Sequence, residues 1–530
     1  MATGASSRPA SRGAATLSAL ACAALALSDA ACAQQAVESA ATAEPAATAQ
    51  PAAAQRRPFS LSPNASITET LTDNVNLTPQ KQAELITQPT LGLHADANTA
   101  WLKGFLDYSL SGLWYARGKA GDQFQNTLNA LASAELVQNH LNVDVTGNIS
   151  QQSISAFGVQ SPDTSLNNPN QTTVSSFSVS PYFHGRLAGV ADYEARLRYV
   201  DTRSNDASAS NNTLSAESLK IGDSSVARKI NWSGELSRTV IDYTEGVRNE
   251  DDLLRGVLSW NLNQEFALSA IGGSESNNYA TPEKESHTVW GAGLKWVPSP
   301  RTSLSAEAER RFFGNSHNIL FTHRSARTVW TLADTRDVST NTSPTLGNLG
   351  TAYDLFFQQF ASVEPDPVLR QQLVNNFLLA NGINPTATAI ARFLNSAVTL
   401  QRMQSLSFAW LGVRDTVSVS ASQSWQQQLN VLSGAGSPVA NATRVNQRGL
   451  LATVSHRLTP QSTIALAVTQ QHTTGTIDSD TSTLRSLSAL FTTKVGRRSD
   501  VSFGARRAVF TNVTTPYNES AIFGTIRAQF

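Results

Sequence analysis

The sequence predicts an all-β protein, a transmembrane antiparallel up-and-down β-barrel of about 22 strands, within a range of roughly 18 to 24. A short helical insert is expected in one long extracellular loop. Three observations support this fold class. Apolar and polar residues alternate in many segments, short and long connections follow one another, and the chain ends in one more alternating segment with an aromatic last residue. A period of two is the pattern of a strand with one apolar face.

Residues 1–33 are expected to be a secretory signal peptide that sends the chain through the Sec pathway. Arg8 and Arg12 precede an apolar run, and Ala31-Cys32-Ala33 supplies small residues for cleavage. The run is shorter than the roughly 20 residues that cross a membrane as a helix. Cys32 does not indicate a lipoprotein, because Asp29 stands where the lipidation motif has leucine.

Composition limits the remaining classes. Both cysteines of the chain lie in the leader, so the mature chain has none for a disulfide, a thiolate metal site or a cysteine nucleophile. Residues 34–57 are rich in Ala, Pro and Gln and are expected to form a disordered periplasmic lead-in, followed by the barrel over 58–530. The formal net charge is zero and 15% of residues are charged, which excludes nucleic acid as a partner.

The alternating segments run for about 10 to 15 residues, longer than the usual globular strand of five or six. That length matches a tilted strand that crosses a membrane. Clear examples are Leu102–Trp114, Ala191–Tyr199, Leu254–Leu262, Trp290–Trp296 and Val417–Ala421. A soluble β-sandwich or β-propeller is the alternative, but it predicts shorter strands and no terminal aromatic residue.

The connections between these segments are of two kinds. Short turns are expected near 97–99, 137–140, 188–189, 298–301, 414–415, 459–461 and 496–500, and longer polar loops over 73–83, 153–170, 203–210, 277–285, 432–441 and 474–480. Outer-membrane barrels have short periplasmic turns and long extracellular loops. Aromatic girdles are expected from Trp101, Trp260, Trp296 and Phe530 at the periplasmic interface and from Tyr115 and Tyr243 at the outer one.

One segment, residues 352–395, has a helical period instead. Asp366-Pro367 predicts a helix start, and Gly382 followed by Pro385 predicts its end. Leu369, Leu373 and Phe377 form its apolar stripe, with Val374 and Leu378 beside them. Shorter helices are expected before it, with Leu355, Phe356 and Phe360, and after it from Asn384-Pro385, with Ile390 and Phe393. We expect these helices to fold over or into the pore mouth as a lid, with Leu369, Leu373 and Phe377 holding it.

The last segment, Asn518–Phe530, is the expected membrane-insertion signal. Ile522, Ile526 and the terminal Phe530 lie on one apolar face, and Phe523 is out of step. This ending resembles the carboxyl-terminal signal by which outer-membrane barrels are recognised for insertion. Outer-membrane lipid and the barrel assembly machinery are therefore expected partners, and the outer membrane of a Gram-negative bacterium is the expected location.

Three stretches carry a resemblance to a known family. They are Thr68–Gln80 (TETLTDNVNLTPQ), Leu102–Arg117 (LKGFLDYSLSGLWYAR) and Tyr353–Pro385, with its YDLFFQQF motif. Together they resemble the PEP-CTERM-system-associated outer-membrane proteins of proteobacteria, although Pro89-Thr90 stands where a Pro-Gly is expected. The resemblance implies a barrel that works with exosortase and exopolysaccharide machinery, and it supplies no catalytic residues.

No motif for catalysis, cofactor binding or metal binding is present, so no enzyme activity and no cofactor are expected. The eight histidines are scattered, and His317 and His323 are the closest pair. Asp73, Asn74 and Asn76 offer oxygen ligands, but a turn accounts for them better than calcium does. A lipid-modifying or proteolytic barrel therefore ranks last among the functions considered.

Arginines on the polar faces of strands are the candidate lumen-lining residues: Arg196, Arg198, Arg255, Arg448 and Arg527. They either line a path for anions or sugar acids or form structural ion pairs across the lumen, and the second interpretation is favoured. The leading function is a channel or scaffold for export of exopolysaccharide or of sorted surface proteins, which would make that polymer or its export proteins partners. The alternative is a structural or adhesive barrel whose insert docks a partner.

Overall fold

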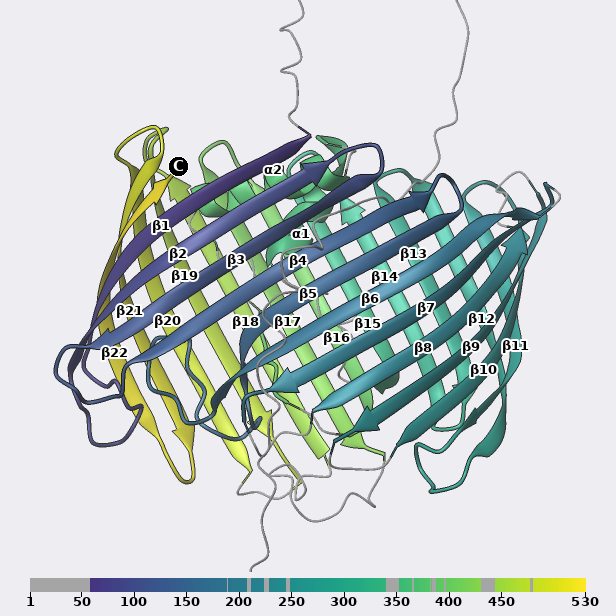
Figure 1. The fold of residues 1–530 in the computed structure, drawn as a ribbon, viewed down its shortest axis with the longest axis horizontal. Helices are drawn as coiled ribbons and strands as arrows, with labels where there is room; N and C mark the ends of the chain where they lie inside the picture. The colour runs from purple at the N-terminus through teal and green to yellow at the C-terminus, as the bar shows by residue number, and fades with distance from the viewer. Residues whose placement is uncertain are drawn as a thin grey trace, which may run out of the picture.

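The protein forms one closed antiparallel sheet of 22 strands, seen from the side in the computed structural model of Figure 1. The structure describes residues 58–187, 189–206, 211–223, 228–244, 248–339, 352–364, 367–381, 383, 388–394, 397–429, 444–476 and 480–530. The predicted leader and lead-in lie outside these residues.

Each strand pairs with its neighbours in sequence, and β1 pairs with β22 to close the barrel. The strands are β1 Phe59–Thr72, β2 Glu84–Asn98, β3 Leu102–Tyr115, β4 Gln123–Val137, β5 Leu141–Ser153, β6 Gln171–Leu187, β7 Ala191–Ser204, β8 Asn212–Asp223, β9 Ile230–Tyr243, β10 Asn249–Asn261, β11 Phe266–Asn277, β12 Glu285–Ser299, β13 Thr302–Arg311, β14 Gly314–Arg324, β15 Thr328–Ser339, β16 Thr399–Leu411, β17 Asp415–Gln428, β18 Arg444–Arg457, β19 Ser462–Thr474, β20 Thr481–Lys494, β21 Ser499–Asn512 and β22 Tyr517–Gln529. The helices α1 Ala352–Gln359, η2 Phe360–Ser362 and α2 Pro367–Ala380 lie between β15 and β16. The predicted fold class, including the strand number and the helical insert, is confirmed.

Period-two alternation gives the wall two different faces. On β10, Leu254, Leu258 and Trp260 are more than half exposed on the outside, whereas Arg255 on the opposite face makes ion pairs within the barrel. A continuous apolar outer face is stable in lipid, because a closed barrel leaves no unpaired strand edge there. This is the architecture of an outer-membrane β-barrel. None of the helices in the described residues is long and apolar enough to cross a membrane.

The two ends of the barrel differ as the connections predict. The start of β1 and the carboxyl terminus lie at the end with the short turns, which is uppermost in Figure 1. We call this the short-turn end and the opposite one the long-loop end. By the rule for such barrels the short-turn end is periplasmic.

The terminal strand is placed by the same alternation. Ile522 and Ile526 are 59% and 58% exposed on the outer wall, and Phe530 is 66% exposed beside them. The amide of Phe530 donates to the carbonyl of Pro63 at 2.9 Å, which extends the closing pair of strands. Phe523 breaks the pattern because it faces the lumen, where its ring covers Gly504 so closely that a Cβ there would lie 2.3 Å from Cζ.

Two expectations about the long-loop end are wrong. Tyr115 and Tyr243 are 5% and 9% exposed and point into the barrel, so they form no girdle. They are buried because loop residues pack against them from inside. The helix expected after Pro385 is also absent from the described part of this segment, since residues 388–394 are not helical and Phe393 instead forms a bridge to Ser153.

Candidate functional site: the lumen and its inserted segment

The helices between β15 and β16 lie inside the barrel. β15 ends at the long-loop end, yet α1 and α2 lie near the short-turn end (Figure 1). Phe356 on α1 and Val374 on α2 are fully buried, and they share a cluster with Val329 and Ala409. Val329 is the second residue of β15 and Ala409 is near the end of β16. The segment 352–394, called the insert from here on, therefore extends along the lumen rather than only over its outer mouth.

Apolar packing holds the helices together. Phe377 lies with its ring centroid 5.1 Å from that of Phe356 and 5.1 Å from that of Phe360. Burying apolar surface of this kind contributes roughly 25 cal/mol per Å². The helices therefore form a small core of their own against the barrel wall.

The predicted apolar stripe of the long helix needs correction. Val374 and Leu378 have no exposed surface, whereas Leu373 is only partly buried and is absent from the cluster. The side chain of Leu369 lies outside the described residues. The stripe is therefore centred on Val374 and Leu378, because this face meets both α1 and the wall.

The return path of the insert follows the inner wall of β18 and β19. The amide of Ala391 donates to Gln471 Oε1 at 2.8 Å, and Gln447 Nε2 donates to the carbonyl of Ala391 at 3.3 Å. Ala389 lies directly against Gly449, where a Cβ would be 1.8 Å from the Ala389 carbonyl oxygen. Only glycine permits this approach.

Small polar side chains explain why the insert fits this part of the wall. A barrel of 22 strands encloses more space than its own side chains can fill. Hydroxyl residues on the inner face of β16–β18 are short, and the insert lies against this wall at Ser455, whose Oγ is 3.5 Å from Asn381 Oδ1. The buried members are Thr399, Ser405, Ser407, Thr416, Ser418, Ser420, Ser422, Ser424, Thr453 and Ser455.

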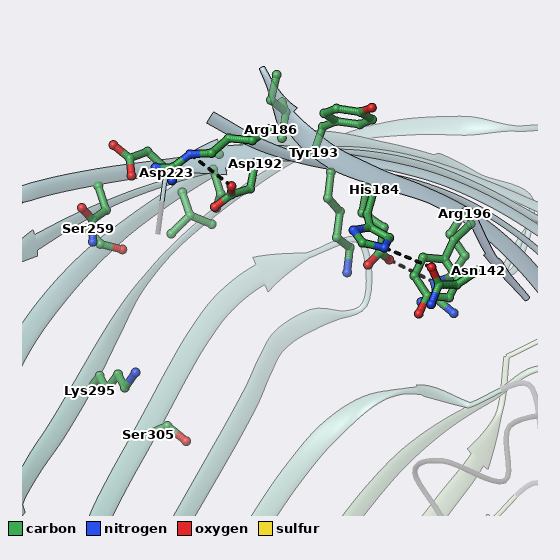
Figure 2. Close-up of a pocket in the computed structure, with 18 of the residues that line it drawn as sticks. Asn142, His184, Arg186, Asp192, Tyr193, Arg196, Asp223, Ser259, Lys295 and Ser305 are labelled. Carbon is green, nitrogen blue, oxygen red and sulfur yellow. Dashed lines mark hydrogen bonds and ion pairs between the residues drawn. The ribbon is translucent and has the colours of Figure 1, made fainter. Parts of the chain in front are cut away.

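The rest of the lumen at the short-turn end is a water-accessible cavity of about 1840 Å³. Its wall runs from Asp96 on β2 to Glu307 on β13, and Tyr353 and Phe357 of α1 close its other side. These two rings are stacked, with centroids 5.7 Å apart. Figure 2 shows polar residues of this wall directed into one space, with Lys295 and Ser305 further round from Arg196.

Charges in this cavity are mixed, with an acidic excess. Eight carboxylates face five lysine and arginine side chains. Arg196 pairs with Asp144 at 2.7 Å and Glu194 at 3.0 Å, and its guanidinium lies 3.9 Å from the centre of the Tyr182 ring. The carboxylates are Asp96, Glu135, Asp144, Asp192, Glu194, Asp223, Glu265 and Glu307, and the cations are Lys103, Arg186, Arg196, Lys220 and Lys295.

The five candidate arginines do not form one path. Arg196 and Arg198 lie on the inner face of β7, and Arg255 on β10 pairs with Glu309 at 2.5 Å and Glu307 at 3.1 Å. Arg527 is on the inner face of β22, in register with Asp500. The carboxylates beside Arg196 and Arg255 make these two residues parts of an ion-pair network, not free anion ligands.

The assignment of Arg448 to the lumen is wrong, because this residue lies on the outer wall. Its neighbours Gln447 and Leu451 are buried inside, while Leu450 is 41% exposed outside. The alternation misleads here because Val445 is apolar without facing lipid. It packs against Phe393 of the insert, inside the barrel.

The long-loop end is covered on one side by residues 154–170, which fold into the barrel. Val159 and Leu166 join a buried cluster with Tyr115, Phe510 and Tyr517 of the wall. The hydroxyl of Tyr115 donates to the carbonyl of Ser165 at 2.8 Å, and that of Tyr517 to the carbonyl of Gln160 at 2.5 Å. This loop therefore narrows the mouth.

An ion pair fixes the tip of this loop. Arg506 on the inner wall contacts Asp163 at 2.6 Å and Glu519 at 2.8 Å. Burial alone would raise the pKa of the Asp163 carboxyl, but the charge of Arg506 and hydrogen bonds from Arg506 and Ser165 hold that pKa below its usual value. The loop thus depends on an ionised aspartate.

Several of these residues escape sequence reasoning. Gly449 and Arg506 occur in ordinary alternating strands, and only their partners in the insert and the loop give them a role. The available signal was the loop 154–170 itself, because Val159 and Leu166 are apolar residues that a solvated loop does not require.

The other candidate ligands have structural partners. Asp73 pairs with Lys81 at 2.6 Å, and Asn74 Nδ2 donates to the carbonyl of Thr78 at 2.7 Å, as in a self-stabilised turn. His317 contacts Asp334 at 2.9 Å and His323 contacts Thr302 at 2.8 Å, at different points of β14. Within the described residues, no group of three or more His, Cys, Asp or Glu is placed to hold a metal ion.

No protein-family model matches the sequence, and no curated protein matches it. Among solved structures, the chain is similar to the FrpB iron transporter from Neisseria meningitidis, with 9% identity and a TM-score of 0.45 over 88% of this chain and 82% of that one. It is similar to the siderophore receptor PirA from Pseudomonas aeruginosa, with 10% identity and a TM-score of 0.42 over 89% and 80%. It is also similar to OccK2 from Pseudomonas aeruginosa, solved in complex with glucuronate, with 9% identity and a TM-score of 0.33 over 89% of this chain and 98% of that one. Similarity at this level carries no argument about the function of this chain.

Proposed function

We propose that this protein is a gated conduit of the outer membrane, in which the insert occupies the lumen and shifts to let a large polar substrate pass. The observation that carries the proposal is the course of the insert, with helices at one end and a return segment along β18 and β19. A purely structural barrel has no need for a segment that is fitted to its inner wall over this distance.

The chemistry of the lumen supports a hydroxyl-rich substrate. The inner face of β16–β18 carries serine and threonine hydroxyls, and Tyr353 and Phe357 offer stacked rings beside the cavity. The acidic excess of the cavity disfavours a densely anionic polymer, since net negative charge in a confined space repels anions. A neutral or sparsely charged polysaccharide fits better, in keeping with the export of exopolysaccharide that the family resemblance implies. The partner in transport would then be the machinery that makes or delivers this polymer.

The alternative is a structural or adhesive barrel whose insert docks a partner. That function requires an apolar surface directed outward. In the described residues, the apolar faces of α1 and α2 are buried on each other and on β15 and β16. The structure therefore gives a docking function less support than a gate.

Locking the insert to the wall tests the proposal. Ser455 Oγ and Asn381 Oδ1 are 3.5 Å apart, and the chain after the leader has no cysteine of its own. In a planar bilayer, the oxidised N381C/S455C double variant should stay at the low-conductance level, and a reductant should restore openings. The matched control is T68C/T525C, which joins β1 to β22 where the two hydroxyls are 2.9 Å apart.

In this control pair, oxidation should leave the openings unchanged. If the locked variant conducts as freely when oxidised as when reduced, the insert is not the gate. If neither the natural protein nor the reduced variant conducts, the protein is not a conduit.

A further inference from the structure

Three arginines form a patch on the outer wall at one height of the barrel. They are Arg448 on β18, Arg485 on β20 and Arg507 on β21. The strands β18 to β21 are consecutive in the barrel wall (Figure 1). Each faces outward, because inner-wall positions next to them, Gln447, Leu484 and Ala508, are buried. We call these three residues the arginine patch.

The patch lies just above the lipid-facing band. On each of the three strands, the first three of the four outward positions between the arginine and the short-turn end are apolar. They are Leu450, Ala452 and Val454 on β18, Leu487, Ala489 and Phe491 on β20, and Ala505, Phe503 and Val501 on β21. Each arginine is the fifth outward residue from that end, so four steps of about 6.8 Å along a strand tilted by roughly 40° raise it about 21 Å.

That height is near the upper edge of an apolar band of about 25 Å, on the side of the long loops. A guanidinium on a flexible stem reaches the remaining distance by snorkelling. The patch is therefore at the level of the lipid headgroups in the outer leaflet.

The register brings the three charges close together. Arg485 pairs with Val509 and Arg507 with Leu487, so the two arginines are diagonal neighbours, about 7–8 Å apart at Cα. Arg448 lies opposite His472, which lies opposite Thr483, two residues from Arg485. A headgroup that spans two strands would touch more than one guanidinium.

Within the described part of the chain, no carboxylate neutralises this patch. Among the described residues on the outward positions of β17–β22, Asp415 is the sole acid, and it is at the short-turn end, paired with His456. The contrast is the outer wall of β7–β10. There Arg203 pairs with Asp201 at 2.9 Å and Arg238 with Glu250 at 3.3 Å.

We propose that the arginine patch binds the phosphate groups of a phosphorylated glycolipid in the outer leaflet, whose acyl chains lie on the apolar residues below. Guanidinium groups bind phosphate oxygens in pairs, which gives the site geometry as well as charge. The occupant is a lipid, because the charges adjoin a lipid-facing surface and lie where its headgroup must be. One side of the barrel thus holds a fixed anionic lipid shell.

The test measures binding of bis-phosphorylated lipid A to the full mature protein, delipidated in detergent, by native mass spectrometry. Each basic residue near an anionic headgroup contributes about fivefold, so R448Q/R485Q/R507Q should lose on the order of a hundredfold in affinity. On that side Arg248 also pairs with Glu250, at 3.1 Å. The control R203Q/R238Q/R248Q removes the same charge from the carboxylate-paired side and should change affinity by less than about threefold. Lipid A stripped of its phosphates should bind the natural protein as weakly as intact lipid A binds the patch variant.

Heat-modifiable mobility on gels checks that each variant is folded. If the patch variant R448Q/R485Q/R507Q does not fold, the variant with lysine at the same three positions is measured instead. It keeps the charges and should keep most of the binding. Equal affinity in the patch variant and the natural protein would overturn the proposal. So would an equal loss in the control variant, or undiminished binding of the phosphate-free lipid.

Discussion

A side chain at Gly449 should dislodge the return segment of the insert. In Gly449→Ala the new Cβ would lie 1.8 Å from the Ala389 carbonyl oxygen and 2.4 Å from its carbon. Ordinary contacts between such atoms are about 3.5 Å, so the segment must withdraw by about 1.5 Å or more. The bond from Ala391 to Gln471, now 2.8 Å, would then exceed hydrogen-bonding distance.

The energetic effect follows from the bonds that are lost. Ala391 makes two hydrogen bonds to the wall, with Gln471 and Gln447, and each contributes roughly 1 kcal/mol. A loss of about 1–3 kcal/mol raises the population of a released segment by about 5- to 150-fold. Gly449→Val should give a larger effect than Gly449→Ala.

Single-channel recording in a planar bilayer measures this population as the fraction of time in the higher-conductance state. The control is Gly272→Ala, because a Cβ on Gly272 would meet no atom within 4 Å. Barrel mobility on gels should be unchanged in all three variants, since strand pairing is not altered. If Gly449→Val has the same open fraction as Gly272→Ala, the return segment does not restrict the pore.

Two further predictions concern assembly and the outer mouth. Deletion of Phe530 should lower the outer-membrane yield several-fold while the assembled barrel keeps its heat-modifiable mobility, because the exposed ring at the end of β22 serves recognition and not packing. Phe530→Tyr should have the yield of the natural protein. An undiminished yield of the chain without Phe530 would contradict the proposed insertion signal. The lowered pKa of Asp163 means that its stabilisation of the loop is present above the usual aspartate pKa and is lost as the pH falls through the folded value. Hydrogen exchange of residues 154–170 should accelerate in that acid range. Asp163→Asn should accelerate the exchange already at pH 7, because it lowers the stability of the folded loop by about 2 kcal/mol. Exchange that is the same at every pH in both proteins would refute this role of Asp163.

The barrel could be predicted because its strands obey a local rule. The alternation around Leu254 and Trp260 requires only that one face meet lipid and the other water, and the structure has that arrangement. The strand number followed from counting such segments. The helix over Pro367–Ala380 was also predictable, since its first residue is a proline and a glycine follows it.

The site was harder to predict because its contacts join distant parts of the chain. Arg448 was placed on the wrong face because Val445 is apolar for contact with Phe393, not with lipid. Tyr115 was assigned to an interface, but the loop carbonyl of Ser165 accepts its hydroxyl hydrogen inside the barrel. Near the long-loop end both faces of a strand can be apolar, so alternation loses its meaning there.

The wall and the insert explain each other's composition. Serines such as Ser420 and Ser422 fill little space, and in a lumen of this width they would leave water along the wall. The insert fills that space, but along β18 and β19 it does so with polar contacts, such as those of Ala391, which water can replace at small cost. Its helices are held differently, because Phe356 and Val374 are buried among apolar residues of β15 and β16. A segment with one strongly held end and one weakly held end is suited to a movement that begins along the return path.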